Sequence, residues 1–125
     1  MKPLFHKGKE NEFNMIKVSG KSGKSIIAEA IQKYNGAVIY SYYDELLPFE
    51  NGYHVDSGKY SVNEFCEGIT TDIKEEVEKN ERSLLNMVII YTNLSDISEI
   101  GTLYAYAERL EEVEKLVGTV VVMTQ

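Results

Sequence analysis

The sequence has few residues that restrict a chain covalently. Its 125 residues include one cysteine, Cys66, so no disulfide can form within the chain, which favours a reducing compartment. Only two prolines are present, Pro3 and Pro48, so long helices and strands can form. No apolar run approaches the about 20 residues that a membrane-spanning helix needs, and residues 1–13 lack a signal-peptide core. These absences predict a cytoplasmic protein without membrane contact.

Positive charge is also scarce. The chain has 13 lysines and arginines against 20 acidic residues, a net charge of −7, which argues against a broad electropositive surface for nucleic acid. The acidic residues gather at 72–81 and 108–115, where helical apolar spacing indicates solvated helix faces. Two histidines and one cysteine lack the spacing of a zinc site, and no Ser-His-Asp hydrolase signature is present.

An apolar content of 43% predicts one folded domain over residues 1–125, with residues 1–11 as a flexible N-terminal tail. Continuous apolar runs, rich in β-branched residues, alternate along the chain with amphipathic segments. Strands are predicted at 12–18, 37–43, 86–92 and 119–125, and helices at 25–34, 61–80 and 98–117. This order predicts an α/β fold of three layers, a mainly parallel sheet of about four strands with helices on both faces.

Three local patterns refine these elements. The first helix is expected to bury one face formed by Ile26, Ile27, Ala30 and Ile31. Ser61 followed by Glu64 has the spacing of a capping box at the start of the second helix. The stretch 44–60 contains Pro48, Asn-Gly and Ser-Gly, so it is interpreted as a long irregular loop, a feature that is often functional.

Some individual side chains have two interpretations. His54 near Asp56 offers an acid/base pair, although one such pair in a loop is weak evidence for catalysis. Tyr40 and Tyr42 share one side of a strand and are expected to pack in the core, whereas Tyr43 lies nearer the end of that strand. Cys66 falls on an apolar helical face and is expected to be buried and inert.

The tripeptide Gly-Lys-Ser occurs twice in succession, at 20–22 and 23–25. The second copy lies where a glycine turn becomes a helix, and the free N–H groups of a helix start favour phosphate binding there. Lys24 can then reach the outer phosphates, and the hydroxyl of Ser25 can bind Mg²⁺. The plainer alternative is a helix capped by Ser22, with glycines only in the turn.

This stretch resembles the Walker A motif of P-loop NTPases, except that Val18 stands where the pattern has glycine. Over residues 15–125 the order of elements also resembles the RecA-like group. The resemblance implies that ATP or GTP binds with Mg²⁺. The implied phosphate-binding residues are Ser19, Gly20, Lys21, Ser22, Gly23, Lys24 and Ser25. It also implies an acidic residue after the second strand, Asp44 or Glu45, as catalytic base, with Asp44 sharing the metal with Ser25, and Gln125 as sensor of the γ-phosphate.

The Walker B strand departs from the family, because Tyr91 and Thr92 stand where an aspartate is expected and Asp96 comes too late. The preferred interpretation is therefore a nucleotide-binding protein with slow or partner-stimulated hydrolysis. A small-molecule or nucleoside kinase and an inactive P-loop fold used as an interaction module remain alternatives. A homo-oligomer or another protein partner is compatible with each, and the DNA association of RecA-like relatives gains no support from the acidic charge. The chain is short for the group, so a minimal core and a fragment both stay open.

Overall fold

The computed structural model describes residues 14–20, 23–45, 49, 52–79, 85–110 and 117–125, and the tail predicted at 1–11 lies outside them. The elements follow in the order β1 (Asn14–Ser19), α1 (Lys24–Asn35), β2 (Val38–Tyr43), β3 (Gly52–Asp56), α2 (Val62–Lys79), β4 (Leu85–Thr92), α3 (Ile97–Arg109) and β5 (Val117–Thr124).

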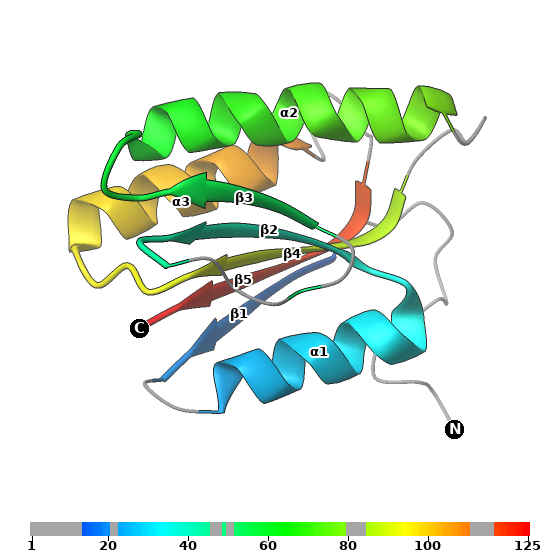
Figure 1. Ribbon diagram of the computed structural model, residues 1–125, viewed down its shortest axis with the longest axis horizontal. Coiled ribbons are helices and arrows are strands. Elements are labelled where there is room, and N and C mark those ends of the chain that lie inside the picture. Colours follow the sequence, from blue (N-terminus) through cyan, green and yellow to red (C-terminus); the bar gives the residue numbers. More distant parts are fainter. Residues whose placement is uncertain (1–13, 21–22, 46–48, 50–51, 80–84, 111–116) are drawn as a thin grey trace.

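All five strands belong to one parallel sheet with the order β1-β5-β4-β2-β3. Helix α1 covers one face of the sheet, and α2 and α3 cover the other, which gives three layers (Figure 1). The predicted α/β class with a parallel sheet is confirmed. Because the strands are parallel, their carboxyl ends lie along one edge of the sheet, called the rim below.

The predicted number of strands was wrong, because β3 lies inside the stretch interpreted as a loop. Gly52 is the first residue of β3, and the Ser57-Gly58 turn follows its last residue, so neither glycine interrupts the strand. Gly52 opens the strand against β2, and a Cβ at this position would lie 2.4 Å from the carbonyl oxygen of Ile39. Val55 is buried, and the ring of Tyr53 meets that of Tyr40 edge to face. A glycine that permits close backbone approach and one buried valine thus suffice for an edge strand.

Helix boundaries agree with prediction where local capping chemistry sets them. At α2, Ser61 N donates to Glu64 Oε1 (2.9 Å) and Glu64 N donates to Ser61 Oγ (3.2 Å), which confirms the capping box. Helix α3 is shorter than predicted: it ends at Arg109, and Val117 belongs to β5. Gly118 therefore lies within a strand and does not end the helix.

The face that α1 buries also differs from the predicted one. Lys24 and Ala28 face the sheet, and Ile31 is half-buried. Ile26 and Ile27 remain exposed, at 71% and 44%. Because Lys24 occupies the first inward position, the isoleucines that follow it are carried to the outer side of the helix.

Candidate functional site

The loop after β1 is shaped by two glycines with left-handed backbone. Gly20 has φ 147° and Gly23 has φ 82°, angles that an L side chain adopts only with strain. Gly23 is the N-cap of α1, and its carbonyl accepts the first helical hydrogen bond from Ile27 N at 3.1 Å. Lys21 and Ser22 lie outside the described residues. The capping predicted for Ser22 therefore lies outside them as well. The N-cap Gly23 has no side chain, so the N–H groups of the first helical turn have no side-chain cap within the described loop.

Lys24 lies buried at the rim, with 5% of its surface exposed. Its Nζ donates to the carbonyl oxygens of Thr92, at 2.9 Å, and Thr124, at 2.8 Å, which are the last residues of β4 and β5. The amine also lies 5.6 Å from the ring centroid of Tyr91. Burial lowers the pKa of Lys24 from its ordinary value. Within the described part of the chain, the partners of this cation are carbonyls and a ring, and no carboxylate neutralises it.

A set of hydrogen bonds between the ends of β4 and β5 fixes the two carbonyls that hold the amine. Thr92 Oγ1 donates to the carbonyl of Met123 at 2.9 Å and accepts from Leu94 N at 3.2 Å. Gln125 N donates to the carbonyl of Leu94 at 2.9 Å. Thr92 is fully buried, so its hydroxyl positions the backbone of the rim and is not open to a metal-bound water. Sequence reasoning missed this role, for which the only signal was a threonine ending a long apolar run.

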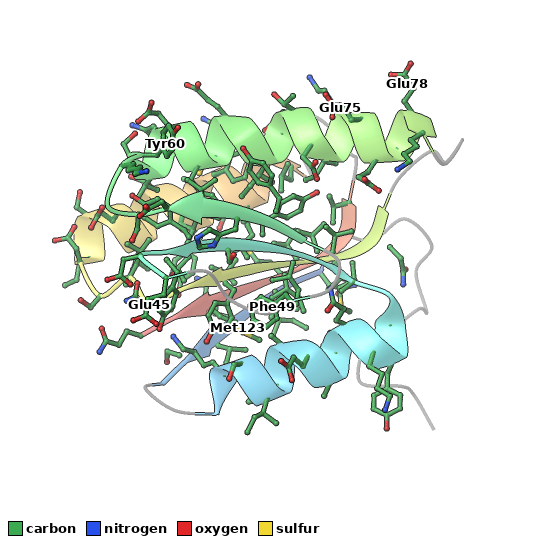
Figure 2. All side chains as sticks on the ribbon, viewed as in Figure 1. Glu45, Phe49, Tyr60, Glu75, Glu78 and Met123 are labelled. Carbon is green, nitrogen blue, oxygen red and sulfur yellow. The ribbon has the colours of Figure 1, made fainter. Side chains whose placement is uncertain are left out.

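Ser25 borders an aromatic group next to the start of α1. Burial raises the pKa of Tyr91 from its ordinary value, and the nearby Ser25 side chain opposes this rise. The ring of Tyr91 lies 5.7 Å from that of Tyr43 and 5.2 Å from that of Phe49, between centroids. Phe49 is seen between the sheet and α1 in Figure 2. This group brings β2, β4 and the start of α1 together at the rim.

The three tyrosines of β2 separate as predicted. Tyr40 and Tyr42 are buried in the core on the side of α2 and α3, and Tyr43 is half-buried near the rim. Tyr40 Oη donates to Asp72 Oδ2 at 2.7 Å, which ties β2 to α2. The predicted core packing of Tyr40 and Tyr42 is confirmed.

Asp44 and Glu45 follow β2 directly and are exposed at the rim, where Figure 2 labels Glu45. Strand β2 pairs with β4, and the Lys24 amine lies between the ends of β4 and β5, so Asp44 follows the strand next to one of the two that hold the amine. The structure thus places these carboxylates on the same rim as the lysine. It records no contact between them and Lys24 or Ser25 in the described ranges.

Gln125 stands beside the glycine loop. Ser19 of β1 is in register with Thr124 of β5, so Gln125 continues the row next to Gly20. Gln125 is exposed, and the hydrogen bond from its backbone N–H to the carbonyl of Leu94 fixes its backbone. The predicted site residues from β1, β5 and α1 are therefore neighbours, while those from β2 lie further along the rim.

Asp96 has a structural position. Its Oδ2 accepts from Glu99 N at 3.0 Å, so it is the N-cap of α3. No cluster of three or more histidine, cysteine, aspartate or glutamate side chains suited to a metal occurs among the residues with described placement. A metal at this rim would therefore depend on the Ser25 hydroxyl, one of the exposed carboxylates and the nucleotide's own oxygens.

The other candidate residues are accounted for by packing. His54 Nδ1 lies 2.9 Å from Ser41 Oγ, its register partner in β2, while Asp56 Oδ1 accepts from Gly58 N at 2.8 Å. The two side chains thus have separate partners, which leaves no acid/base relay between them. Cys66 is buried as predicted, and burial raises the pKa of its thiol to about 12, so it is a poor nucleophile.

No helix of the described ranges is both long enough and apolar enough to span a bilayer. Comparison of the chain with models of known protein families, with curated proteins and with solved structures gave no match in any of the three. Function therefore has to be argued from the site itself.

Proposed function

We propose that the rim formed by Ser19–Ser25, with the ends of β4 and β5, binds the phosphates of a nucleotide such as ATP or GTP together with Mg²⁺. The observation that carries this proposal is the burial of Lys24 without a carboxylate partner among the described residues. A buried charge is costly unless it is compensated, and two carbonyl dipoles compensate a full positive charge only in part. A phosphate group would supply the missing negative charge.

In this proposal each group at the rim has a separate task. The Lys24 ammonium has three N–H donors, two of which are used by carbonyls, which leaves one for a phosphate oxygen. The N–H groups of the first turn of α1, for which the described loop supplies no side-chain cap, add donors and the positive end of the helix dipole. The left-handed glycines let the backbone approach the anion without a Cβ in the way.

Mg²⁺ would bind to the Ser25 hydroxyl and to phosphate oxygens, with Asp44 or Glu45 acting through a water across the rim. The end of β4 offers the buried Thr92 and the exposed Asn93, neither of which carries a negative charge. Transition-state charge would thus be stabilised mainly by Lys24 and the backbone, so we expect slow hydrolysis that a partner could accelerate. In this scheme Gln125, next to Gly20, contacts the γ-phosphate.

A panel of ATP, GTP, their diphosphates and non-hydrolysable analogues, each with and without Mg²⁺, tests the proposal by thermal shift. The melting temperature should rise with at least one triphosphate and rise further with Mg²⁺. Phosphate release without an acceptor would favour hydrolysis, and transfer only to an added small molecule would favour a kinase. No shift with any nucleotide, at concentrations up to several millimolar, would leave an interaction module as the better description.

A further inference from the structure

A groove of about 600 Å³ runs along the outer edge of the sheet, between β3 and α2, away from the candidate phosphate site. In Figure 1, β3 forms the edge of the sheet beneath α2. The groove is lined by Tyr53, His54, Val55, Asp56, Lys59, Tyr60, Glu64, Glu67, Gly68 and Thr71. One wall is therefore an extended strand and the other is one side of a helix.

The strand wall has hydrogen-bonding groups to offer. Strand β3 pairs with β2 on one side and with no other strand of the described sheet on the other. In a parallel pair, alternate residues direct their N–H and C=O groups away from the partner, so part of the backbone of Gly52–Asp56 faces outward. An edge of this kind is a template for another extended chain.

The helix wall lies close to the side chains of that edge. Glu64, Glu67, Gly68 and Thr71 lie on one side of α2 at spacings of three and four residues. A Cβ on Gly68 would lie 3.0 Å from the hydroxyl of Tyr53 and 3.2 Å from its ring. Glycine inside a helix costs about 1 kcal/mol relative to alanine, and here its lack of a side chain lets the tyrosine ring lie against the helix.

The charge of the groove indicates what would enter it. Its lining carries three carboxylates, on Asp56, Glu64 and Glu67, against one ammonium group, on Lys59. One carboxylate oxygen of Glu64 and one of Asp56 accept backbone N–H bonds, so both groups are held in place. Apolar surface from Val55 and the rings of Tyr53 and Tyr60 lies between them.

We propose that this groove binds an extended, lysine- or arginine-containing segment of a partner protein, which adds to β3 as a sixth strand. Backbone hydrogen bonds to β3 supply affinity. Alternate basic side chains point to the α2 side, where their charged ends meet Glu64 and Glu67 and their aliphatic stems pack on Val55 and Tyr53. The groove lies on the α2 side of the sheet, at least two strand spacings or about 10 Å from the Lys24 amine, which lies on the α1 side. The proposal therefore does not depend on nucleotide binding.

The test uses the full 125-residue chain labelled with ¹⁵N and a probe peptide, acetyl-Lys-Val-Lys-Val-Lys-amide, in NMR titrations. Amide signals of β3 and of the facing side of α2 should shift with saturation at millimolar peptide. The same peptide with glutamate in place of lysine should not saturate. Strand addition uses alternate amides only, so of two N-methylated forms, on the valines or on the lysines, one should bind at least about tenfold more weakly than the other.

Charge reversal on the protein gives the matched comparison. Glu67→Lys should raise the Kd of the probe about tenfold, whereas Glu29→Lys, the same change on α1 at the other face of the sheet, should leave it unchanged (Figure 1). Both positions are exposed, so neither change should unfold its helix. Shifts that map elsewhere, equal behaviour of the two N-methylated peptides, equal effects of the two variants, or no binding would each overturn the proposal.

Discussion

The buried amine of Lys24 gives the most direct test of the candidate phosphate site. In Lys24→Met an apolar chain of similar length replaces the ammonium group, so the contact with the ligand is lost while the space stays filled. A charge-assisted hydrogen bond to a phosphate in a largely buried setting is worth about 2–3 kcal/mol. Its removal should therefore raise the nucleotide Kd by about 30- to 150-fold.

The change in Kd converts into a thermal shift. Nucleotide at 100 times its Kd stabilises the folded protein by about 2.7 kcal/mol, which for a chain of this length corresponds to a rise in Tm of about 10 °C. When the Kd rises about 100-fold at the same nucleotide concentration, the stabilisation falls to about 0.4 kcal/mol and the shift to about 1–2 °C. Differential scanning fluorimetry resolves this difference easily.

The variant must be compared with its own nucleotide-free form, because Lys24→Met also removes the donor that holds the carbonyls of Thr92 and Thr124. Lys33→Met is the matched control, since Lys33 is exposed in the last turn of the same helix. It should keep the full shift. If Lys24→Met also kept a shift of about 10 °C, the amine would not contact the ligand, and the choice of the second Gly-Lys-Ser copy would be wrong.

Three further predictions concern stability, measured by urea unfolding. The pKa of the Cys66 thiol is raised from 9.0 to about 12 in the folded state, so the stability it contributes is complete below pH 9 and is lost as the pH rises towards 12. Between pH 8 and 10 the free energy of unfolding of Cys66→Ala should therefore fall by about 1.4 kcal/mol less than that of the parent chain. An equal fall in the two proteins would contradict burial of the thiol. Gly52→Ala should destabilise the protein by about 2 kcal/mol or more, because its Cβ would lie 2.4 Å from the backbone of Ile39. Gly101→Ala, with open space around it inside α3, should stabilise the protein by up to about 1 kcal/mol. The reverse order of stability would show that β3 is misplaced. Asp96→Ala should cost about 1 kcal/mol through loss of the α3 cap, with nucleotide affinity unchanged; weakened Mg-nucleotide binding would instead assign Asp96 to the metal.

Local chemistry in the sequence was sufficient for most elements. The apolar runs and amphipathic segments gave four of the strands and all three helices, and the capping box at Ser61 and Glu64 set the start of α2. The periodic patterns and the capping box depend on interactions between residues that are close in the chain, so they can be recognised without knowledge of the fold. The glycine turn before the first helix was likewise visible in the sequence, although the helix was predicted from residue 25 and begins at Lys24.

Strand β3 and the inward face of α1 could not be recognised in the same way. The residues Gly52–Asp56 become a strand because Ile39–Tyr43 of β2 offers a free edge and Gly52 permits close approach. The inward side of α1 is set by Lys24, whose amine finds its acceptors on two strands 68 and 100 residues further along the chain. The prediction from periodicity considered only apolar residues, and it therefore placed on the buried face of α1 two isoleucines that are exposed.

The sequence by itself determined the alternation of strands and helices, the parallel sheet, and a glycine turn with a lysine at the start of the first helix. Only the tertiary structure decided that the lysine is buried between the ends of β4 and β5, that Thr92 fixes those ends, and that β3 and α2 enclose a groove. The physical reason is range: capping and periodicity act within a few residues, whereas burial of a charge and pairing of a strand edge depend on which distant segments meet.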